Sequence, residues 1–448
     1  MRTSVNPLLA LFALVCAAHL ATLLVGIGAF WHADELIQYI EQPYLLLHGL
    51  PLSAWEFQSG TRNWLFPGAI LGLLWGAEAV GITNPLVLLV LLRVVTKILF
   101  LGAWYRLALL AHEGAHGRGW LRLLPLVLMG LYPVSLFATN HTLSEVWSLV
   151  LLVWGAGEWL AALSGKPASA RYAGVLLGLA VLVRLQTAVA LPPLLLLGWW
   201  QHRRGAATGI LLTTAAHGLL VLVAGGMLDA VTYGSFAHSL IANLSAHFGD
   251  GGQLFAVMGT NPWHYFITEP FTYAPVAAAA TWLLFLAGAW RDPRSPIAWS
   301  VVVFVAVHSA IPHKELRFML PALPLALLVA GDGLAWAGDL LTRRVGRGSP
   351  IALLILVAAL LAPVGVHLAA MDDADAGPTQ MLSGISELPG EPVLVTATPG
   401  RNIWPAQSRF VVGSQTRTVT AASIGDLAPQ CQQVESAAPL LLFGPDTE

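Results

Sequence analysis

Five groups of polar side chains interrupt an otherwise apolar sequence, and each contains residues that can move protons or bind anions. The groups are His32-Ala33-Asp34-Glu35, Thr139-Asn140-His141 with Glu145, Arg184-Leu185-Gln186, Tyr233-Gly234-Ser235 through Tyr265, and His313-Lys314-Glu315 through Phe318. Carboxylates can act as general bases, and guanidinium groups can bind phosphate oxygens in pairs. If the fold brings the five groups to one side of a membrane, they predict an enzyme active site there.

The first group contains the candidate catalytic residues, Asp34 and Glu35. Burial and nearby charges can separate the pKa values of adjacent carboxyl groups, so that one stays ionised and serves as a general base. On an α-helix, Asp34, Gln38 and Glu41 would share one face because they are four and three residues apart. The alternative is a set of solvated carboxylates beside aromatic residues of the membrane interface.

Basic residues form the second part of the candidate site. His313, Lys314 and Arg317 lie between two apolar runs, where Lys and Arg suit the binding of a phosphate. Arg184 lies inside an apolar stretch, and an intramembrane arginine usually faces a cavity or an anionic partner. In the alternative interpretation, these side chains extend to lipid headgroups.

The remaining groups carry weaker signals. Asn140, His141 and Glu145 lie at the end of an apolar run, where they are either site residues or helix caps. The stretch from Asn261 to Tyr265 combines a turn with two aromatic rings and an imidazole. Such rings suit stacking on a sugar, although the same residues also form interfacial belts.

The composition predicts that membrane helices position these groups. Of the 448 residues, 56% are hydrophobic and only 10% are charged, whereas soluble domains carry about 25% charge. Apolar runs of ~20 residues, long enough to cross a bilayer, recur along the chain, and we interpret the first as a retained span rather than a signal peptide. Eleven spans are predicted, near 7–29, 84–110, 120–138, 142–163, 172–185, 186–200, 206–227, 272–290, 296–311, 317–337 and 351–370. The pair within 172–200 is too short for two full crossings, so one or both must be short or broken.

The distribution of Lys and Arg fixes the predicted orientation. With Arg2 on the inside, most basic residues of the short connections fall on the cytoplasmic side. This holds only if residues 64–82 do not cross the membrane. We therefore predict long extracytoplasmic loops at 31–83 and 228–271.

The chain is predicted to have two parts. Residues 1–371 form the polytopic catalytic domain, and residues 372–448 form a small extracytoplasmic segment with strand-like stretches at 392–395 and 440–443. The whole sequence contains two cysteines, Cys16 and Cys431, and we predict no disulfide between them.

Several common signatures are absent from the sequence. It contains no P-loop, no Gly-rich dinucleotide fingerprint, no zinc motif of the His-Glu-x-x-His type and no Gly-x-Ser-x-Gly elbow. We predict no metal, no cofactor and no nucleic-acid partner.

The same groups, in this order, resemble the dolichol-phosphate-mannose-dependent mannosyltransferases that extend N-glycan precursors and GPI anchors. The family's first-loop motif matches His32, Asp34, Glu35, Gln38, Glu41, Gly49, Trp55, Glu56, Arg62, Asn63 and Pro67. The later blocks match Tyr233-Gly234-Ser235, Asn243, Gly259 through Trp263-His264-Tyr265, and His313-Lys314-Glu315-Leu316-Arg317-Phe318. Two positions depart from the family pattern, because Ala33 replaces a proline and Asn261 stands where a histidine is frequent.

The resemblance implies an all-α polytopic membrane protein with the GT-C glycosyltransferase fold. It implies inverting transfer of a sugar, mannose above all, from a polyprenyl-phosphate donor to a glycan or glycolipid acceptor, without a metal. The short loops and the lack of an ER-retention signal favour a bacterial inner-membrane protein whose site faces the periplasm. The oligomeric state stays open.

Residue roles follow from the resemblance together with the groups above. We expect Asp34 to be the general base, with Glu35 as its catalytic neighbour in a supporting role. The donor phosphate is expected to contact His313, Lys314, Arg317 and Arg184. The expected substrate-binding residues are His32, Gln38, Glu41, Trp55, Glu56, Arg62, Trp263, His264, Tyr265 and Glu315.

Two other functions stay open at the level of sequence. A transporter or flippase for lipid-linked sugars needs polar residues accessible on both faces and often has repeat symmetry, and the sequence displays neither. An enzyme that moves another group, such as phosphoethanolamine, usually has a metal site and a soluble domain, and neither is visible in the sequence.

Overall fold

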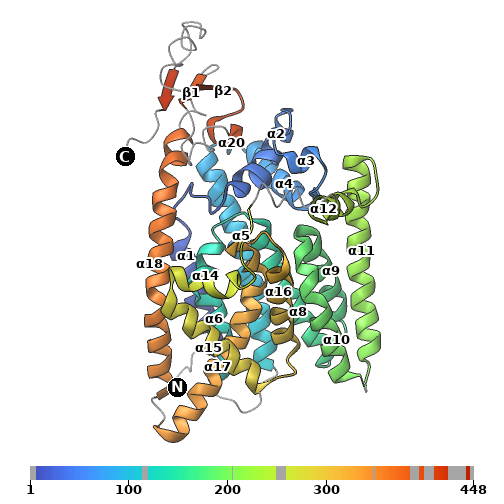
Figure 1. The fold of residues 1–448 in the computed structure, drawn as a ribbon, viewed down its shortest axis with the longest axis vertical. Helices are drawn as coiled ribbons and strands as arrows, with labels where there is room; N and C mark the ends of the chain where they lie inside the picture. Colours follow the sequence, from blue (N-terminus) through green and yellow to red (C-terminus); the bar gives the residue numbers. More distant parts are fainter. Residues whose placement is uncertain are drawn as a thin grey trace.

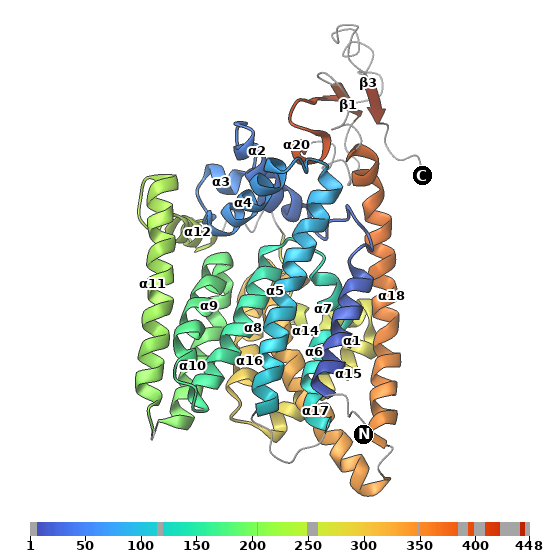
Figure 2. The same cartoon turned by 180° about the vertical axis from the view of Figure 1, so that it is seen from behind.

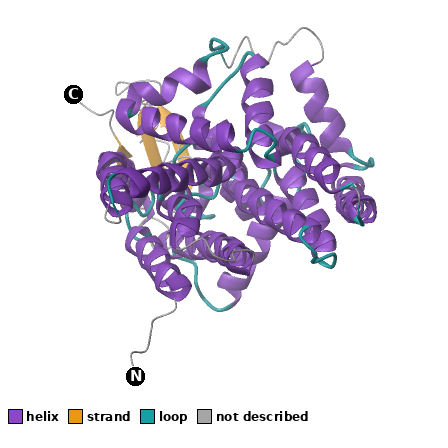
Figure 3. Ribbon diagram, turned by 90° about the horizontal axis from the view of Figure 1, so that it is seen from below, coloured by secondary structure: helices purple, strands orange, loops and turns teal. Residues whose placement is uncertain are grey.

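The computed structural model describes residues 7–113, 120–203, 205–248, 259–346, 349–383, 393–397, 408–421 and 440–443. Helices make up nearly all of the described chain, and the few strands lie to one side when the bundle is viewed along its long axis (Figure 3). The N-terminus and the C-terminal strands lie at opposite ends of this axis (Figure 1). We call the end that carries the C-terminal strands the site end.

The long helices cross the molecule between its two ends. They are α1 (Pro7–Thr22), α5 (Pro85–Glu113), α8 (Ser144–Leu163), α9 (Ser169–Val183), α10 (Leu191–His202), α11 (Ala207–Tyr233), α15 (Pro275–Arg291), α16 (Pro296–Ala310), α17 (Leu323–Arg344) and α18 (Ser349–Ser383). The segment after α5 is divided into η2 (Trp120–Leu123), α6 (Leu124–Leu131) and α7 (Pro133–Ala138).

Five of the described helical segments are long and apolar enough to cross a membrane, so the chain is an integral multi-pass membrane protein. The most apolar stretch of α8 is 72% buried, which places this helix in the centre of the bundle. The corresponding shares are 17% in α11 and 11% in α18. These two helices form opposite edges of the bundle (Figures 1 and 2), where their apolar side chains suit contact with lipid.

One crossing breaks at a proline, and two short helices meet beside the candidate site. Pro133 begins α7 directly after the extended residue Tyr132. The expected short pair consists of α9 and α10, which have 15 and 12 residues and are joined by the 3-10 turn η3 (Leu185–Ala190). Arg184 is the extended residue at this break. Broken helices are tolerated at membrane depth where protein buries them, and Arg184 is buried.

Glycines allow close contact between neighbouring helices. A Cβ at Gly174 of α9 would lie 2.3 Å from the carbonyl oxygen of Thr214 in α11. A Cβ at Gly288 of α15 would lie 2.0 Å from the carbonyl oxygen of Val329 in α17. Without a large hydrophobic gain between lipid-facing helices, such close backbone packing is a main source of their association.

The first predicted loop lies across the site end of the bundle (Figures 1 and 2). It comprises the π-helical segment η1 (Glu35–Glu41), α2 (Gln42–Leu47), α3 (Trp55–Gln58) and α4 (Leu65–Ala79). With 15 residues, α4 is shorter than the ~20 residues that a full crossing needs.

At the site end, two helices extend past the ends predicted from hydropathy. α11 continues beyond 227 to Tyr233, because the polar side chain of Asp229 finds hydrogen-bond donors there. α18 continues beyond 370 to Ser383, so the predicted boundary at 371 falls inside this helix. Hydropathy alone cannot detect such extensions, because it treats every charged residue as a reason to stop.

The remaining described helices are shorter. They are α12 (His238–Phe248), α14 (Tyr265–Tyr273), the 3-10 segment η5 (Leu316–Ala322) and α20 (Arg409–Val412). A parallel three-stranded sheet has the order β2-β1-β3, with β1 at Val393–Ala397, β2 at Arg417–Ala421 and β3 at Leu440–Phe443. β1 and β3 match the strand-like stretches of the sequence, whereas β2 was not predicted. Cys431 lies outside the described residues.

Candidate active site

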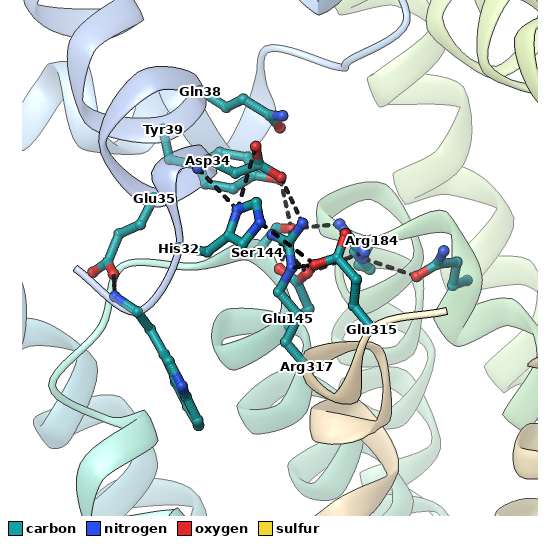
Figure 4. Close-up of polar contacts among 12 residues, drawn as sticks. His32, Asp34, Glu35, Gln38, Tyr39, Ser144, Glu145, Arg184, Glu315 and Arg317 are labelled. Atoms are coloured by element: carbon teal, nitrogen blue, oxygen red, sulfur yellow. Dashed lines mark hydrogen bonds and ion pairs between the residues drawn. The ribbon is translucent and has the colours of Figure 1, made fainter. Parts of the chain in front are cut away.

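The first and last polar groups of the sequence meet through an ion pair (Figure 4). Arg317 Nη2, at the start of η5, lies 2.7 Å from Asp34 Oδ2, just before η1. His32 Nδ1 accepts a hydrogen bond from the Asp34 backbone nitrogen and lies 3.5 Å from Asp34 Oδ1. Residues 283 positions apart in the chain therefore share one centre.

Glu145, in the first turn of α8, lies between two guanidinium groups. Its Oε1 atom is 3.1 Å from Arg184 Nη2 and 3.4 Å from Arg317 Nη1, and its side chain is 0% exposed. The hydroxyl of Ser144 donates to Glu145 Oε2 and lies 2.8 Å from the hydroxyl of Tyr39. A buried carboxylate is stable only with such compensation.

Glu315 completes the cluster on the side of the predicted second loop. Its Oε2 atom accepts from Arg317 Nε at 2.6 Å and lies 3.5 Å from His32 Nε2. Its Oε1 atom lies 2.9 Å from His313 Nε2. Arg317 thus contacts three carboxylates, and Figure 4 shows these side chains converging from the loop before η1, from α8 and from the loop before η5.

The electrostatics of the cluster keep its loop carboxyl groups ionised. Burial raises the pKa of Asp34, but the contact with His32 and the charge of Arg317 lower that pKa by more, to well below its usual range. Burial likewise raises the pKa of Glu315, but the contacts with Arg317 and His313 give a net lowering. Asp34 is therefore a carboxylate at physiological pH, as a proton acceptor must be.

Arg62 supplies a cation that no acidic side chain pairs with. Within the described part of the chain, no hydrogen bond or ion pair engages its guanidinium group, and its Nε atom is buried without a partner. Burial lowers the pKa of Arg62, but Tyr39, Glu56 and Glu145 raise it by more. A charged, partly desolvated group of this kind is a candidate for binding an anionic ligand.

The predicted second loop holds the backbone around Arg62. The hydroxyl of Tyr233 donates to the Arg62 carbonyl oxygen at 2.7 Å. Asn63 donates to Asp229 Oδ1, and Asp229 Oδ2 accepts from the backbone and hydroxyl of Ser239 in α12. α11 ends at Gly234, whose φ of 80° favours glycine and turns the chain towards α12.

Lys314 has a different role from the one that its charge suggests. Its ammonium group donates to the carbonyl oxygens of Asn261, at 2.7 Å, and Pro312. The Asn261 side chain in turn donates to the Lys314 carbonyl oxygen. In this structure Lys314 therefore fastens two loops together, and it is 3% exposed.

The aromatic residues expected to bind substrate lie at the edge of the site. Trp263 and Trp55 are 69% and 43% exposed. His264 contacts the hydroxyl of Thr268 within its own helical turn, and Tyr265 begins α14. Within the described part of the chain, none of these four side chains forms a hydrogen bond or ion pair with Asp34, Glu315 or Arg317.

The expectation that Asp34, Gln38 and Glu41 share one helical face fails at Glu41. Gln38 donates to Glu56 at 2.5 Å, whereas Glu41 accepts hydrogen bonds from Ser408 and its neighbours. The physical reason is that η1 is π-helical. Its i→i+5 hydrogen bonds place more residues in each turn than an α-helix does, so the α-helical spacing fails; such segments are frequent at functional sites.

Glu35 points away from Asp34 (Figure 4). Its Oε2 atom lies 2.9 Å from His141 Nδ1 and accepts from the Trp31 backbone, while Oε1 accepts from the Thr142 backbone. Glu35 is therefore a buried anchor beside the cluster.

Sequence reasoning missed two buried cations of α5, Arg93 and Lys97. Arg93 donates to the carbonyl oxygens of Leu23, Val25 and Gly26, where the chain leaves α1. Lys97 donates to Thr22, Leu136 and Thr139. Two charges inside an apolar span were the available signal.

Among the described residues, no group of three His, Cys, Asp or Glu side chains could hold a metal ion.

Residues 10–377 match the model of the Alg9-like mannosyltransferase family. The mannosyltransferase APTG1 of Arabidopsis thaliana is 25% identical over 72% of this chain and 58% of its own length. The GPI mannosyltransferase 3 of Drosophila melanogaster is 26% identical over 73% of this chain and 56% of its own length. The chain thus spans a little more than half the length of these curated relatives.

The fold also has a counterpart among solved structures. ArnT from Cupriavidus metallidurans, bound to undecaprenyl phosphate, superposes with a TM-score of 0.56 at 12% identity. The similarity covers 96% of this chain and 89% of that chain. It shows that this chain has the GT-C fold predicted from the sequence.

Proposed function

Because the chain belongs to the Alg9-like mannosyltransferase family, we propose that it transfers mannose from a polyprenyl-phosphate carrier to an acceptor hydroxyl. The names of the curated relatives support mannose as the sugar. The undecaprenyl phosphate named for the ArnT structure supports a polyprenyl-phosphate donor. We place the site on the periplasmic side of a bacterial inner membrane, since the basic connections lie at the opposite end of the bundle.

The observation that supports this proposal most strongly is that one buried site contains both an ionised carboxylate, Asp34, and a guanidinium group without an acidic partner, Arg62. Asp34, Glu145 and Glu315 hold Arg317 and Arg184 between them. Arg62 adds a positive charge without an acidic partner of its own. A dianionic or monoanionic phosphate ester fits that charge, and Arg can bind it through two parallel hydrogen bonds.

The reaction then follows as an in-line displacement. The acceptor hydroxyl oxygen attacks the anomeric carbon, and the bond from that carbon to the phosphate oxygen breaks, with inversion. Asp34 takes the hydroxyl proton, while the electron pair leaves with the polyprenyl phosphate. Arg62 and Arg317 stabilise the charge that develops on the leaving oxygen.

Arg317 can interact with both the base, Asp34, and the donor phosphate, because its guanidinium group contacts several anions at once. With the site empty it lies 2.7 Å from Asp34 and 2.6 Å from Glu315. When a phosphate attracts the guanidinium, its hold on Asp34 weakens, and the pKa of Asp34 rises towards the usual value. Donor binding would thereby make Asp34 a stronger base.

The test is an assay of the purified protein with labelled polyprenyl-phosphate mannose, glucose or arabinose and a panel of glycolipid acceptors. The proposal expects sugar transfer from the mannose carrier, with inversion at the anomeric carbon. A donor carrying another sugar as the sole productive one would overturn the assignment of mannose. No transfer from any of the polyprenyl carriers would overturn the proposed reaction.

A further inference from the structure

The loop that carries Asp34 is fastened to the C-terminal part of the chain at two points. One lies at Glu35, directly after Asp34, and the other lies at Glu41, at the end of η1. Neither contact includes Asp34 or Arg317, and neither uses a side chain that takes part in the proposed reaction. The first reaches the C-terminal part through His141, and the second reaches it directly.

The first point is centred on His141, which is 1% exposed in the turn between α7 and α8. Its Nδ1 atom lies 2.9 Å from Glu35 Oε2, and its Nε2 atom lies 3.6 Å from Asp372 Oδ1 in α18. The ring also packs against Trp31, with 5.3 Å between centroids. The imidazole thus has a carboxylate at each nitrogen.

The surroundings of His141 are charged on several sides. Glu35 faces it from η1, Asp372 faces it from α18, and Arg93 of α5 acts on both carboxylates. Lys97 of α5 also acts on Asp372. Two carboxylates around one imidazole favour the doubly protonated ring, so the link is an imidazolium bridge rather than a single hydrogen bond.

The bridge ends on a part of α18 that packs directly on the chain before Asp34. A Cβ at Gly26 would lie 2.4 Å from the Cβ of Asp372, so only glycine permits this approach at its φ of 55°. Further along α18, Gln380 donates to the carbonyl oxygen of Ile27. Movement of α18 would therefore be transmitted to residues 26–35.

The second point holds the other end of η1. Glu41 accepts from the Ser408 hydroxyl at 2.5 Å and from the backbone nitrogens of Arg409 and Phe410 at 2.8 and 3.0 Å. Tyr44 packs edge-on against Phe410. The carboxylate thereby occupies the N-terminus of α20, where a negative charge is favourable.

We propose that His141 is a positioning residue, which together with Asp372 and the Glu41–Ser408 contact orients Asp34 towards Arg317. The C-terminal segment that follows α18 is then part of the machinery that aligns the base. This inference rests on the proposed function, because it assigns the positioning to the transfer reaction.

The experiment compares His141→Gln, Asp372→Asn and Ser408→Ala with Glu158→Gln in the sugar-transfer assay. Glu158 is buried near the other end of α8 and pairs with Arg106, which is 30% exposed, so its variant controls for the loss of a buried carboxylate with a cationic partner. We expect kcat to fall about 10- to 100-fold in His141→Gln and Asp372→Asn, because small misplacements of a catalytic group have effects of this size. The KM for the donor should change little.

A pH profile distinguishes positioning from a general loss of structure. If Asp34 loses its alignment with Arg317 in the enzyme without donor, its pKa rises towards about 3.9, and the acid limb of kcat/KM, which reports the free enzyme, moves to higher pH. Glu158→Gln should keep the wild-type limb. Unchanged kcat and an unchanged acid limb in folded His141→Gln and Asp372→Asn would overturn the inference, and Ser408→Ala supplies a milder variant if these two do not fold. An inactive wild-type protein would instead overturn the proposed function.

Discussion

Arg62, Arg317 and Lys314 carry the same charge but have different partners, and the partners decide what each cation can do. Arg317 contacts three carboxylates, and the ammonium group of Lys314 donates hydrogen bonds to loop carbonyl oxygens. Among the described residues, Arg62 has neither kind of partner. We therefore propose that Arg62, which the sequence suggests only as a substrate-binding residue, has the main phosphate-binding role instead of Lys314.

Replacing Arg62 by Gln should raise the KM for the polyprenyl-phosphate donor about 10- to 100-fold, since a charged hydrogen bond contributes about 1.5–3 kcal/mol. The matched control is Arg203→Gln, which removes an exposed guanidinium stacked on Trp200 at the far end of α10. Initial rates over a range of donor concentrations measure the effect. Equal donor KM values in the two variants would show that Arg62 does not bind the phosphate.

The pKa of His141 gives a testable pH dependence. Burial lowers this pKa, but the charge of Glu35 and the contact with Asp372 raise it to about 9. The folded state therefore holds a proton that the unfolded state releases near pH 6.5. The resulting stabilisation is complete below about pH 6.5 and is lost as the pH rises to about 9.

Thermal unfolding of the detergent-purified protein at pH 6 and pH 9.5 measures this dependence. From pH 6 to pH 9.5, the melting temperature of the wild type should fall by more than that of His141→Gln, which lacks the titrating group. The same loss in both proteins would exclude His141 as the source.

The sequence predicted which residues meet better than it predicted how they meet. The groups containing Asp34, Glu145, Arg184 and Arg317 converge as expected, because charges in a membrane protein must find one another or water. The destination of Glu41 could not be predicted, since its partner lies 367 residues away at a short helix without a hydropathy signal.

At the scale of elements, helix breaks and helix contacts place the site residues. η3 puts Arg184 at a break beside α8, and η5 does the same for Arg317 before α17. Apolar runs predicted these crossings well, but they could not reveal that α18 continues to Ser383. That continuation depends on a tertiary partner of Asp372, which no local pattern contains.

The α9–α11 contact can be tested at one glycine. Gly174→Ala would place a Cβ 2.3 Å from a backbone carbonyl oxygen, which is closer than any real contact and must move the helices apart. We expect a loss of about 1–3 kcal/mol in stability, measured as a lower melting temperature. Gly209→Ala, which faces open space on α11, should leave the melting temperature almost unchanged. Equal melting temperatures in the two variants would contradict this helix packing.

At the scale of the whole molecule, the two ends of the bundle differ in charge and in function. The connections between α8 and α9, α10 and α11, α15 and α16, and α17 and α18 lie at the end opposite the C-terminal strands (Figures 1 and 2). These connections or their flanking turns carry Lys166, Arg171, Arg203, Arg291, Arg294, Arg343 and Arg344. On the basis of the positive-inside rule, we propose that the site end faces the outside.

Cysteine labelling in a variant without Cys16 and Cys431 tests this orientation. In intact cells, a membrane-impermeant thiol reagent should label a cysteine at Trp55, which is exposed on α3 at the site end. A cysteine at Gly205, between α10 and α11, should react only after the cells are opened. The reverse pattern would place the active site in the cytoplasm.

The central claim is that Asp34 accepts the proton in a sugar transfer, and one comparison tests it most directly. Asp34→Asn and Asp339→Asn make the same chemical change, but Asp339 is a half-exposed partner of Arg343 at the other end of the bundle. Turnover and donor binding are measured for both purified variants. We expect Asp34→Asn to bind donor while its turnover falls by about 10²- to 10⁴-fold, and Asp339→Asn to resemble the wild type. Near-normal turnover in Asp34→Asn would contradict the account.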